Sequence, residues 1–382
     1  MKNKLKKYTL ILYFLLFFAA DKLILIPEVK YKLTETLPGT PYIETLDNLP
    51  VEFFKTEDYK NKKKVWLFGS SRSLWFYKLP VEENTKRDPY LDAGAKQALS
   101  NYNIVPFATP GSTPSIYYVR LYQLLESGYR PDLIALEISI YAFNRQNRFV
   151  NSSKIEGIPL MFTLKHSNEL PSEYVSDIIT SRIFATTRYK VTVTAIKKNL
   201  LGLRKSAQNP LMENLFKSSA DPFQELFEKM TGEERVNRVY TDLDYNDFKG
   251  DAVFTDPREK LMKIQLPLPI LKKEFFTNYE YNEDMILFLE LISRKARSEN
   301  IPVVFWIQKE HPEMQKIIGE DNMDQKWFNR IKNISNQYEI PIMNFNDKGV
   351  LKCDHYGDVF HASGRCITEM SWNLISVLEN KK

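Results

Sequence analysis

The chain has 382 residues, and its 43% hydrophobic and 13% aromatic content can build one large core or two smaller ones. Its 13 glycines and 20 prolines exclude collagen-like and low-complexity chains. The net charge of +5 comes from basic residues spread along the chain, so we expect no nucleic-acid partner. Two cysteines without a Cys-x-x-Cys motif exclude zinc ribbons, thioredoxin chemistry and disulfide-rich scaffolds.

The N-terminus begins like an export signal. Four lysines within residues 2–7 precede an apolar run over 8–20, which resumes after Asp21 and Lys22 and continues to Ile26. The 19 residues from 8 to 26 would span about 28 Å as a helix, which approaches the thickness of a bilayer core. The length and apolar character of this segment therefore predict a transmembrane helix.

We therefore predict an uncleaved signal anchor, a membrane helix over residues 1–27. The lysines would keep the N-terminus cytoplasmic and place the main domain in a periplasmic or extracellular position. A cleaved signal peptide is a weaker alternative because Phe18 occupies a position that signal cleavage requires to be small. A buried or interfacial helix is the third alternative.

Five short apolar runs are typical of buried strands. They cover residues 65–68, 104–108, 133–138, 303–307 and 342–345. Helical periodicity appears between them, in segments that begin near 112, 285, 327 and 363. Strands that alternate with helices predict an α/β fold with a mostly parallel sheet covered on both faces.

The segment boundaries follow from composition. Residues 28–60, which contain three prolines, are predicted to form a connector, and residues 61–382 the main domain. Residues 146–280 interrupt the alternation, because they are polar and lack clear strands. Helical patterns beginning near 170 and over 223–230 predict that this stretch is a helical insertion.

A small-residue turn, Gly69-Ser70-Ser71-Arg72-Ser73, directly follows the first strand. Parallel α/β proteins place reactive groups at the carboxyl ends of their strands. A serine there can project its hydroxyl into the crevice, while nearby backbone N–H groups hold an anion. The alternative is an ordinary strand-to-helix turn in which a serine caps the helix.

A second polar segment lies just before the C-terminal helix. Asp358 and His361 are three residues apart, so one turn can bring the carboxylate to one imidazole nitrogen. The other nitrogen is then able to accept a serine proton. The alternative is a solvated loop that caps the last helix through Ser363.

Together these segments resemble the SGNH (GDSL-like) hydrolase superfamily. The matching features are the Gly-x-Ser turn at Gly69, the glycine of the second-strand turn at Gly111, and the final Asp-x-x-His at Asp358. The resemblance covers roughly residues 62–145 and 283–380. Within the superfamily, the chain is most similar to membrane-anchored envelope members such as the D-alanine-transfer and alginate O-acetylation proteins.

The resemblance implies a three-layer α/β/α sandwich of about five parallel strands and ester chemistry without a metal or other cofactor. By position, Ser71 would be the nucleophile, His361 the base and Asp358 its orienting partner. The backbone N–H groups of Ser71 and Gly111 would bind the oxyanion. The superfamily's Gly-x-Asn-Asp is absent, since residues 139–142 read Ser-Ile-Tyr-Ala.

Other side chains near these motifs are candidates for substrate contacts. Asn144 or Ser139 could replace the missing oxyanion donor, and Arg72 could pair with an anionic substrate group. Ser70 and His311 could also line the site. The last candidate follows the fourth strand.

Two features near the C-terminal segment have alternatives. Asp354 and His355 form a second possible dyad, which ranks below Asp358 and His361. Cys353 and Cys366 bracket the segment and could form a disulfide in an oxidising compartment. The simpler interpretation makes Cys366 a core residue of the last helix.

The leading hypothesis is a membrane-anchored esterase or O-acyltransferase that acts on acyl esters of envelope glycans or lipids. The rival hypothesis is a non-catalytic module with the same sandwich, which binds an envelope glycan or an envelope protein. The missing asparagine favours the rival hypothesis. The complete serine, histidine and aspartate set disfavours it, because a binding module does not need all three residues.

Overall fold

The structure is a computed structural model of the whole chain. It describes residues 2–26, 29, 60–78, 88–108, 111–147, 150, 157–189, 191, 193, 196–197, 248–249, 264–320 and 323–379. Only residues 29 and 60 of the predicted connector over 28–60 are described. The predicted helix over 223–230 lies wholly outside the described residues. The predicted boundaries at 27, 60, 146 and 280 stay predictions.

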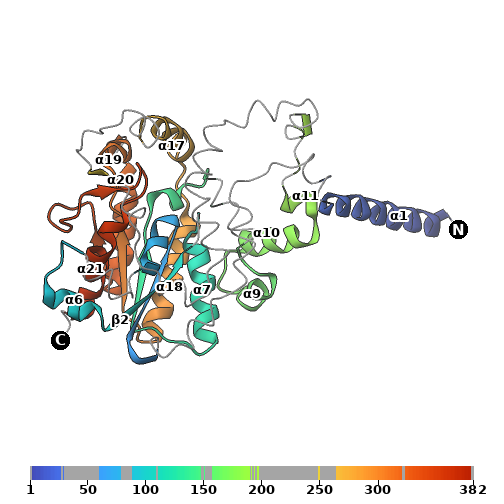
Figure 1. The fold of residues 1–382 in the computed structure, drawn as a ribbon. Helices are drawn as coiled ribbons and strands as arrows, with labels where there is room; N and C mark the ends of the chain where they lie inside the picture. The colour runs from blue at the N-terminus through green and yellow to red at the C-terminus, as the bar shows by residue number, and fades with distance from the viewer. Residues whose placement is uncertain are drawn as a thin grey trace. The chain divides into compact units, whose positions relative to one another are not determined.

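A five-stranded parallel sheet forms the centre of the fold, as the apolar runs predicted (Figure 1). Its strands in spatial order are β2 (Tyr102–Ala108), β1 (Lys63–Gly69), β3 (Leu133–Glu137), β5 (Val303–Ile307) and β6 (Ile342–Asn344). The chain passes from β1 to β2 on one side and returns to β3 on the other side. This reversal of strand order is where open α/β sheets place their sites, outside the carboxyl ends of the strands.

Helices cover both faces of the sheet, which confirms the predicted three-layer α/β/α arrangement. Helices α6 (Ala93–Leu99) and α21 (Ile367–Glu379) share one core with Val65 and Leu67 of β1. Residues alternate across a strand, so Phe68 faces the opposite side, where it meets Tyr117 of α7 (Pro114–Glu126). Helix α18 (Glu283–Ser298) packs beside α7. Figure 1 shows the two pairs of helices on opposite sides of the sheet.

Further elements belong to this unit of the chain. They are η4 (Ser71–Lys78), η5 (Ile140–Phe143), β4 (Phe248–Lys249), α17 (Pro267–Phe275), α19 (Pro312–Gly319), α20 (Met323–Tyr338), β7 (His355–Tyr356) and η9 (Gly364–Cys366). Helix boundaries follow ordinary capping chemistry. The Asp92 carboxylate accepts the Ala95 N–H at 2.8 Å at the start of α6, and the Asn282 side chain accepts the Asp284 N–H at the start of α18.

Residues 1–40 and 154–226 form a second compact unit. Its described helices are α1 (Lys2–Lys22), η1 (Leu23–Leu25), α9 (Leu160–Lys165), α10 (Ser172–Ile183) and α11 (Ala185–Arg188). The buried Asp21 carboxylate accepts the backbone N–H groups of Ala185 and Thr186 at 2.7 and 2.8 Å. The described part of the predicted insertion before residue 190 is therefore helical, and part of it packs with the N-terminus.

The predicted membrane helix is not found. Among the described residues, no helix combines the length and the apolar character needed to cross a membrane. Helix α1 ends at Lys22, and its uninterrupted apolar stretch covers only the 13 residues 8–20, which is about 20 Å of helix. Asp21, which interrupts the apolar run, binds the first turn of α11 through its carboxylate.

Candidate functional site

A sharp turn at the end of β1 presents the predicted nucleophile. Gly69 is the last residue of β1, and Ser71 begins η4. The backbone N–H of Ser73 donates to the Ser70 carbonyl at 3.0 Å and closes the turn. A Cβ at Gly69 would overlap Ser73 Oγ and lie 2.6 Å from Glu137 Oε2. The turn therefore requires glycine at this position because the neighbouring side chains approach so closely.

One carboxylate, that of Glu137 at the end of β3, binds the rest of this turn. It accepts the Ser70 N–H at 2.7 Å, the Ser70 hydroxyl at 2.8 Å and the Ser73 hydroxyl at 2.6 Å. It also accepts Nε and Nη2 of Arg72 at 3.1 and 2.8 Å. Ser71 is thus the one residue of positions 70–73 whose side chain does not bind Glu137.

The Arg72 side chain is buried beneath the turn, with 1% of its surface exposed. Its Nη1 donates to Glu310 Oε1 at 2.6 Å, and its guanidinium lies 5.1 and 5.3 Å from the ring centres of Tyr141 and Phe360. Burial opposes its charge, but the carboxylates of Glu310 and Glu137 outweigh burial and raise the pKa of Arg72. The expectation that Arg72 pairs with a substrate is wrong, because its donors bind internal carboxylates.

Glu310, just after β5, carries the second carboxylate of this buried cluster. Its other oxygen accepts the Tyr141 hydroxyl at 3.1 Å. Burial raises the pKa of Glu310 above its ordinary value, although the Arg72 charge and the Arg72 and Tyr141 hydrogen bonds act in the opposite direction. The cluster therefore contains two carboxylates and one guanidinium in a site nearly closed to water.

The predicted base lies at the tip of a short hairpin. The backbone of Tyr356 forms an antiparallel bridge with Ala362, and the Ser363 N–H donates to the His355 carbonyl at 2.9 Å. Strand β4 pairs with β7 on this hairpin. These backbone bonds join the two ends of the segment and bring His361 to the turn between them.

Asp358 organises that tip. Its Oδ1 accepts the backbone N–H groups of Phe360 and His361 at 2.6 and 2.8 Å, and its two oxygens lie 3.0 and 2.9 Å from His361 Nδ1. Burial would raise the pKa of Asp358, but the imidazole and these hydrogen bonds hold it below its ordinary value. The carboxylate is therefore stabilised in its ionised form beside the ring.

The two halves meet at Ser71, whose Oγ lies 3.1 Å from His361 Nε2. A carboxylate only accepts hydrogen bonds, so the proton between Asp358 and the ring belongs on Nδ1. In the neutral ring, Nε2 then carries the lone pair that faces the serine hydroxyl. The His361 side chain is 16% exposed and the Asp358 side chain is 30% exposed, so neither is closed off from solvent.

The expected oxyanion donors follow the carboxyl ends of two adjacent strands, β1 and β2. Gly111, with φ of +70°, turns the chain between β2 and α7, and β2 pairs with β1 so that Ala108 is opposite Gly69. Ser112 follows Gly111, and its hydroxyl is buried without a hydrogen-bond partner among the described residues. That the N–H groups of Ser71 and Gly111 bind an oxyanion stays a prediction.

Asn144 does not take the place of the missing oxyanion donor. Its side chain is fully buried and donates to the Phe275 carbonyl at 2.8 Å, while its oxygen accepts the N–H groups of Gln146 and Glu280. Ser139 is also buried. It is the N-cap residue of η5, and a serine has no side-chain amide to replace that of asparagine. The proposed substitution by Asn144 is wrong because both ends of its amide hold the backbone together.

His311 and Ser70 also have internal roles. The His311 ring accepts the Glu313 N–H at 3.2 Å, caps α19 and packs 5.0 Å from the Tyr356 ring. Burial lowers the pKa of His311. The Ser70 hydroxyl donates to Glu137. Both side chains were expected to line the site and contact substrate, but each forms a hydrogen bond within the protein.

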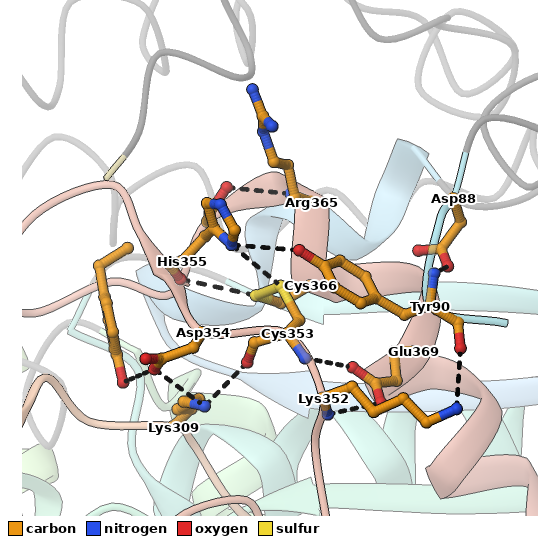
Figure 2. Close-up of a disulfide and its surroundings, with 12 residues drawn as sticks. Asp88, Tyr90, Lys309, Lys352, Cys353, Asp354, His355, Arg365, Cys366 and Glu369 are labelled. Atoms are coloured by element: carbon orange, nitrogen blue, oxygen red, sulfur yellow. Dashed lines mark hydrogen bonds and ion pairs between the residues drawn. A yellow bond between two sulfur atoms is a disulfide. The ribbon is translucent and has the colours of Figure 1, made fainter. Parts of the chain in front are cut away.

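The alternative dyad does not form. Asp354 pairs with Lys309 at 3.3 Å and accepts the Tyr356 hydroxyl at 3.1 Å, while His355 Nδ1 lies 3.1 Å from the Tyr90 hydroxyl. Figure 2 shows Asp354 turned toward Lys309 and His355 beside Tyr90. Within the described residues, no cluster of three or more metal-binding side chains is present.

Cys353 and Cys366 form a disulfide across this hairpin, with a Cα–Cα distance of 5.3 Å (Figure 2). Both cysteines are fully buried in the core beneath α21, and Glu369 of that helix accepts the Cys353 N–H at 2.8 Å. The simpler interpretation of Cys366 as a core residue was incomplete. The bridge therefore joins the two ends of the base segment, residues 353–366, which carries His361.

The chain belongs to the family DUF1574, described as "Protein of unknown function (DUF1574)", whose model matches residues 1–378. No curated protein matches it. Among solved structures, it is similar to a "putative acylhydrolase" from Bacteroides fragilis NCTC 9343, with 10% identity, a TM-score of 0.36, and coverage of 88% of this chain and 97% of the other. It is also similar to the acetyl xylan esterase AlAXEase, with 10% identity, a TM-score of 0.34, and coverage of 82% and 99%.

Because both TM-scores lie below 0.5, the activity of this chain has to be inferred from its own side chains. The resemblance to the D-alanine-transfer and alginate O-acetylation proteins stays a prediction.

Glu137 is the residue of this site that sequence reasoning missed. It follows the apolar run Leu133-Ile-Ala-Leu, and a charged residue at that point is usually taken to mark the exposed end of a strand. One signal was available, because a lone carboxylate at the carboxyl end of a strand next to the turn-bearing strand can reach that turn.

Proposed function

We propose that this protein is a serine-dependent ester hydrolase or O-acyltransferase, with Ser71 as nucleophile, His361 as base and Asp358 as its orienting partner. The observation that carries the proposal is the unbroken series from Ser71 Oγ through the His361 ring to Asp358, at 3.1 and 2.9 Å. Glu137 supports the assignment of Ser71 over its neighbours, because it binds the hydroxyls of Ser70 and Ser73.

The reaction begins when Ser71 Oγ attacks the carbonyl carbon of an acyl ester and its proton passes to His361 Nε2. Asp358 stabilises the imidazolium through the Nδ1–H bond. The ester C–O bond then breaks, and the leaving alcohol takes the proton from Nε2. In the second half, water or an acceptor hydroxyl gives its proton to Nε2 and attacks the acyl carbon. The bond from that carbon to Ser71 Oγ then breaks, and Nε2 returns the proton to Oγ.

The charge that develops on the carbonyl oxygen needs nearby donors. The backbone N–H groups of Ser71 and Gly111 are the proposed donors, since they lie at the ends of paired strands β1 and β2. Losing one such donor costs on the order of 10²–10³ in rate in other enzymes. The absence of the superfamily's asparagine from residues 139–142 therefore favours a slow enzyme, whether the acyl group passes to water or to another hydroxyl.

The proposed setting is an oxidising compartment outside the cytoplasm. The buried disulfide Cys353–Cys366 supports it, because such bonds persist in secreted and periplasmic proteins and are rare in the cytosol. The proposed substrates there are acyl esters of envelope glycans or lipids. The acyl group would pass either to water or to a glycan hydroxyl.

The test is covalent labelling of the full chain by a fluorophosphonate, which reacts with activated serines. We expect wild-type protein to be labelled, and Ser71→Ala and His361→Ala to lose the label. Ser70→Ala is the matched comparison, since it removes the neighbouring hydroxyl and leaves Ser71 in place; we expect it to keep the label but to react more slowly, because the Ser70 hydroxyl donates to Glu137. Labelling that survives in folded Ser71→Ala protein would show that the assignment is wrong.

A second candidate function is a non-catalytic binding module. It is favoured by one observation, that Asn144 is committed to backbone contacts and the superfamily's oxyanion asparagine is missing. Absence of labelling in folded wild-type protein, together with retention of an envelope glycan on immobilised protein, would favour this candidate over the esterase.

A further inference from the structure

The Glu137 carboxylate contacts both sides of the nucleophile. It binds the backbone N–H and hydroxyl of Ser70 on one side, and the side chains of Arg72 and Ser73 on the other. These partners come from three of the four residues in positions 70–73. The turn is thus tied to the end of β3 at points that immediately precede and follow Ser71.

These bonds are formed away from water. Glu137 and Arg72 are each 1% exposed, and hydrogen bonds to a charged group in such an environment are shorter and stronger than neutral ones. A turn held in this way has little freedom to move its Oγ. In enzymes generally, a displacement of about 1 Å in a reacting group can cost about 10²-fold in rate.

The same cluster also reaches the base segment. Arg72, held by Glu137, stacks 5.3 Å from the Phe360 ring, and Phe360 directly precedes His361. Phe360 in turn lies 4.7 Å from Tyr141, which follows β3. One carboxylate therefore orients the residue after the nucleophile, and that residue contacts the one before the base.

We propose that Glu137 is a positioning residue of the reaction, which fixes the 69–73 turn so that Ser71 Oγ stays aligned with His361 Nε2. This inference rests on the proposed function. Glu137 does not touch the reacting atoms, and the geometry assigns its effect to the alignment of Ser71 rather than to the proton transfer between His361 and Asp358.

Glu137→Gln tests this directly, because it keeps the size of the side chain and turns one acceptor oxygen into a donor that faces other donors. We expect the plateau rate of fluorophosphonate labelling to fall about 10²-fold. The pH midpoint of labelling should not move, since the His361–Asp358 pair is intact. A purely structural defect would lower the labelled fraction in proportion to unfolded protein instead of slowing the folded fraction.

The matched comparison is Glu310→Gln, the same change on the other carboxylate that binds Arg72. Its carbonyl oxygen can still accept from Arg72, and it contacts no serine of the turn. We expect it to slow labelling less than about fivefold. If Glu310→Gln slows labelling as much as Glu137→Gln, the effect belongs to the buried charge cluster as a whole and the proposal is overturned.

Ser73→Ala is a second variant, which tests the same proposal if Glu137→Gln protein does not fold. It removes one bond to Glu137 without changing a charge, and we expect labelling to slow about tenfold. Unchanged rates in folded Ser73→Ala and Glu137→Gln proteins would overturn the proposal.

Failure of the proposed function gives a different result. In that case wild-type protein is not labelled, or the label persists in Ser71→Ala protein. If wild-type labelling depends on Ser71 while Glu137→Gln labels at the wild-type rate, only the positioning role is wrong.

Discussion

The serine turn at 69–73 and the base segment at 353–366 are held in opposite ways. The turn depends on buried charges from remote parts of the chain, since Arg72 binds carboxylates 65 and 238 residues away. The base segment is organised by its own residues, through Asp358 three residues before His361 and a disulfide between positions 13 apart. Arg72 and Ser73 of the turn are buried, whereas the Asp358 side chain is 30% exposed.

The two halves of the site are therefore vulnerable to different kinds of change. A change in the buried cluster should disturb the serine turn through packing and hydrogen bonds and leave the His361–Asp358 pair unaffected. A change in the base segment should act through its charge or its covalent bridge and leave the turn in place. Four sets of variants and conditions distinguish these two cases.

Asp358→Asn should abolish most of the proposed activity without unfolding the protein. The amide can donate to Nδ1 and select the wrong imidazole tautomer, a change that costs about 10⁴-fold in a serine protease with the same arrangement. The measurement is the labelling rate across pH. Asp354→Asn is the control, because Asp354 pairs with Lys309 and not with His361. A loss below tenfold in Asp358→Asn would contradict a role for this carboxylate.

Loss of the disulfide should destabilise the base segment by about 3 kcal/mol, as expected for a loop of this length. The double variant Cys353→Ala with Cys366→Ala should show this in urea unfolding. Reducing agent should lower the stability of wild-type protein and leave the double variant unchanged. Equal urea midpoints for wild type and the double variant would mean that hairpin hydrogen bonds alone hold the segment.

Gly69→Ala and Gly357→Ala compare the two regions by the same substitution. A Cβ at Gly69 overlaps Ser73 Oγ, and we expect a loss of about 1–3 kcal/mol from the overpacked turn. A Cβ at Gly357 meets nothing closer than the His361 carbonyl at 3.9 Å, and the change should cost less than about 0.5 kcal/mol. Thermal unfolding of both variants checks the ranking, and the reverse order would contradict it.

The smallest effects should appear in the pH dependence of stability, where the two regions have opposite signs. The pKa of Asp358 is lowered in the folded state, so its contribution is complete above about pH 3.9 and is lost as the pH falls through the lowered value. The pKa of Glu310 is raised, so its contribution is present below about pH 4.3 and is lost as the pH rises through the raised value.

Urea midpoints of wild type, Asp358→Ala and Glu310→Gln from pH 3 to pH 8 measure these signs. The stability gap between wild type and Asp358→Ala should shrink at the acid end. Glu310→Gln should gain stability relative to wild type as the pH rises. A gap to Asp358→Ala that does not change with pH would show that the carboxylate does not carry the expected linkage.

The strands and most helices could be predicted from the sequence, because hydrophobic periodicity is a local property. The run at 65–68 became β1, and the pattern that begins near 285 became α18. The predicted neighbours Asp358 and His361 also meet as expected, since three residues of chain form one tight turn. The order of the motifs suggested Ser71 as their partner, and the parallel sheet places the two within 3.1 Å.

The partners of the buried polar side chains were decided by the tertiary structure alone. Arg72, Asn144 and His311 all looked available for a substrate, yet each bonds inside the protein. Local sequence shows that a side chain is polar, but it does not show which remote group it meets across the sheet. A buried charge or amide without a partner costs free energy, so most of them find one. Glu137 and Glu310 reach Arg72 only because β1, β3 and β5 end at the same edge.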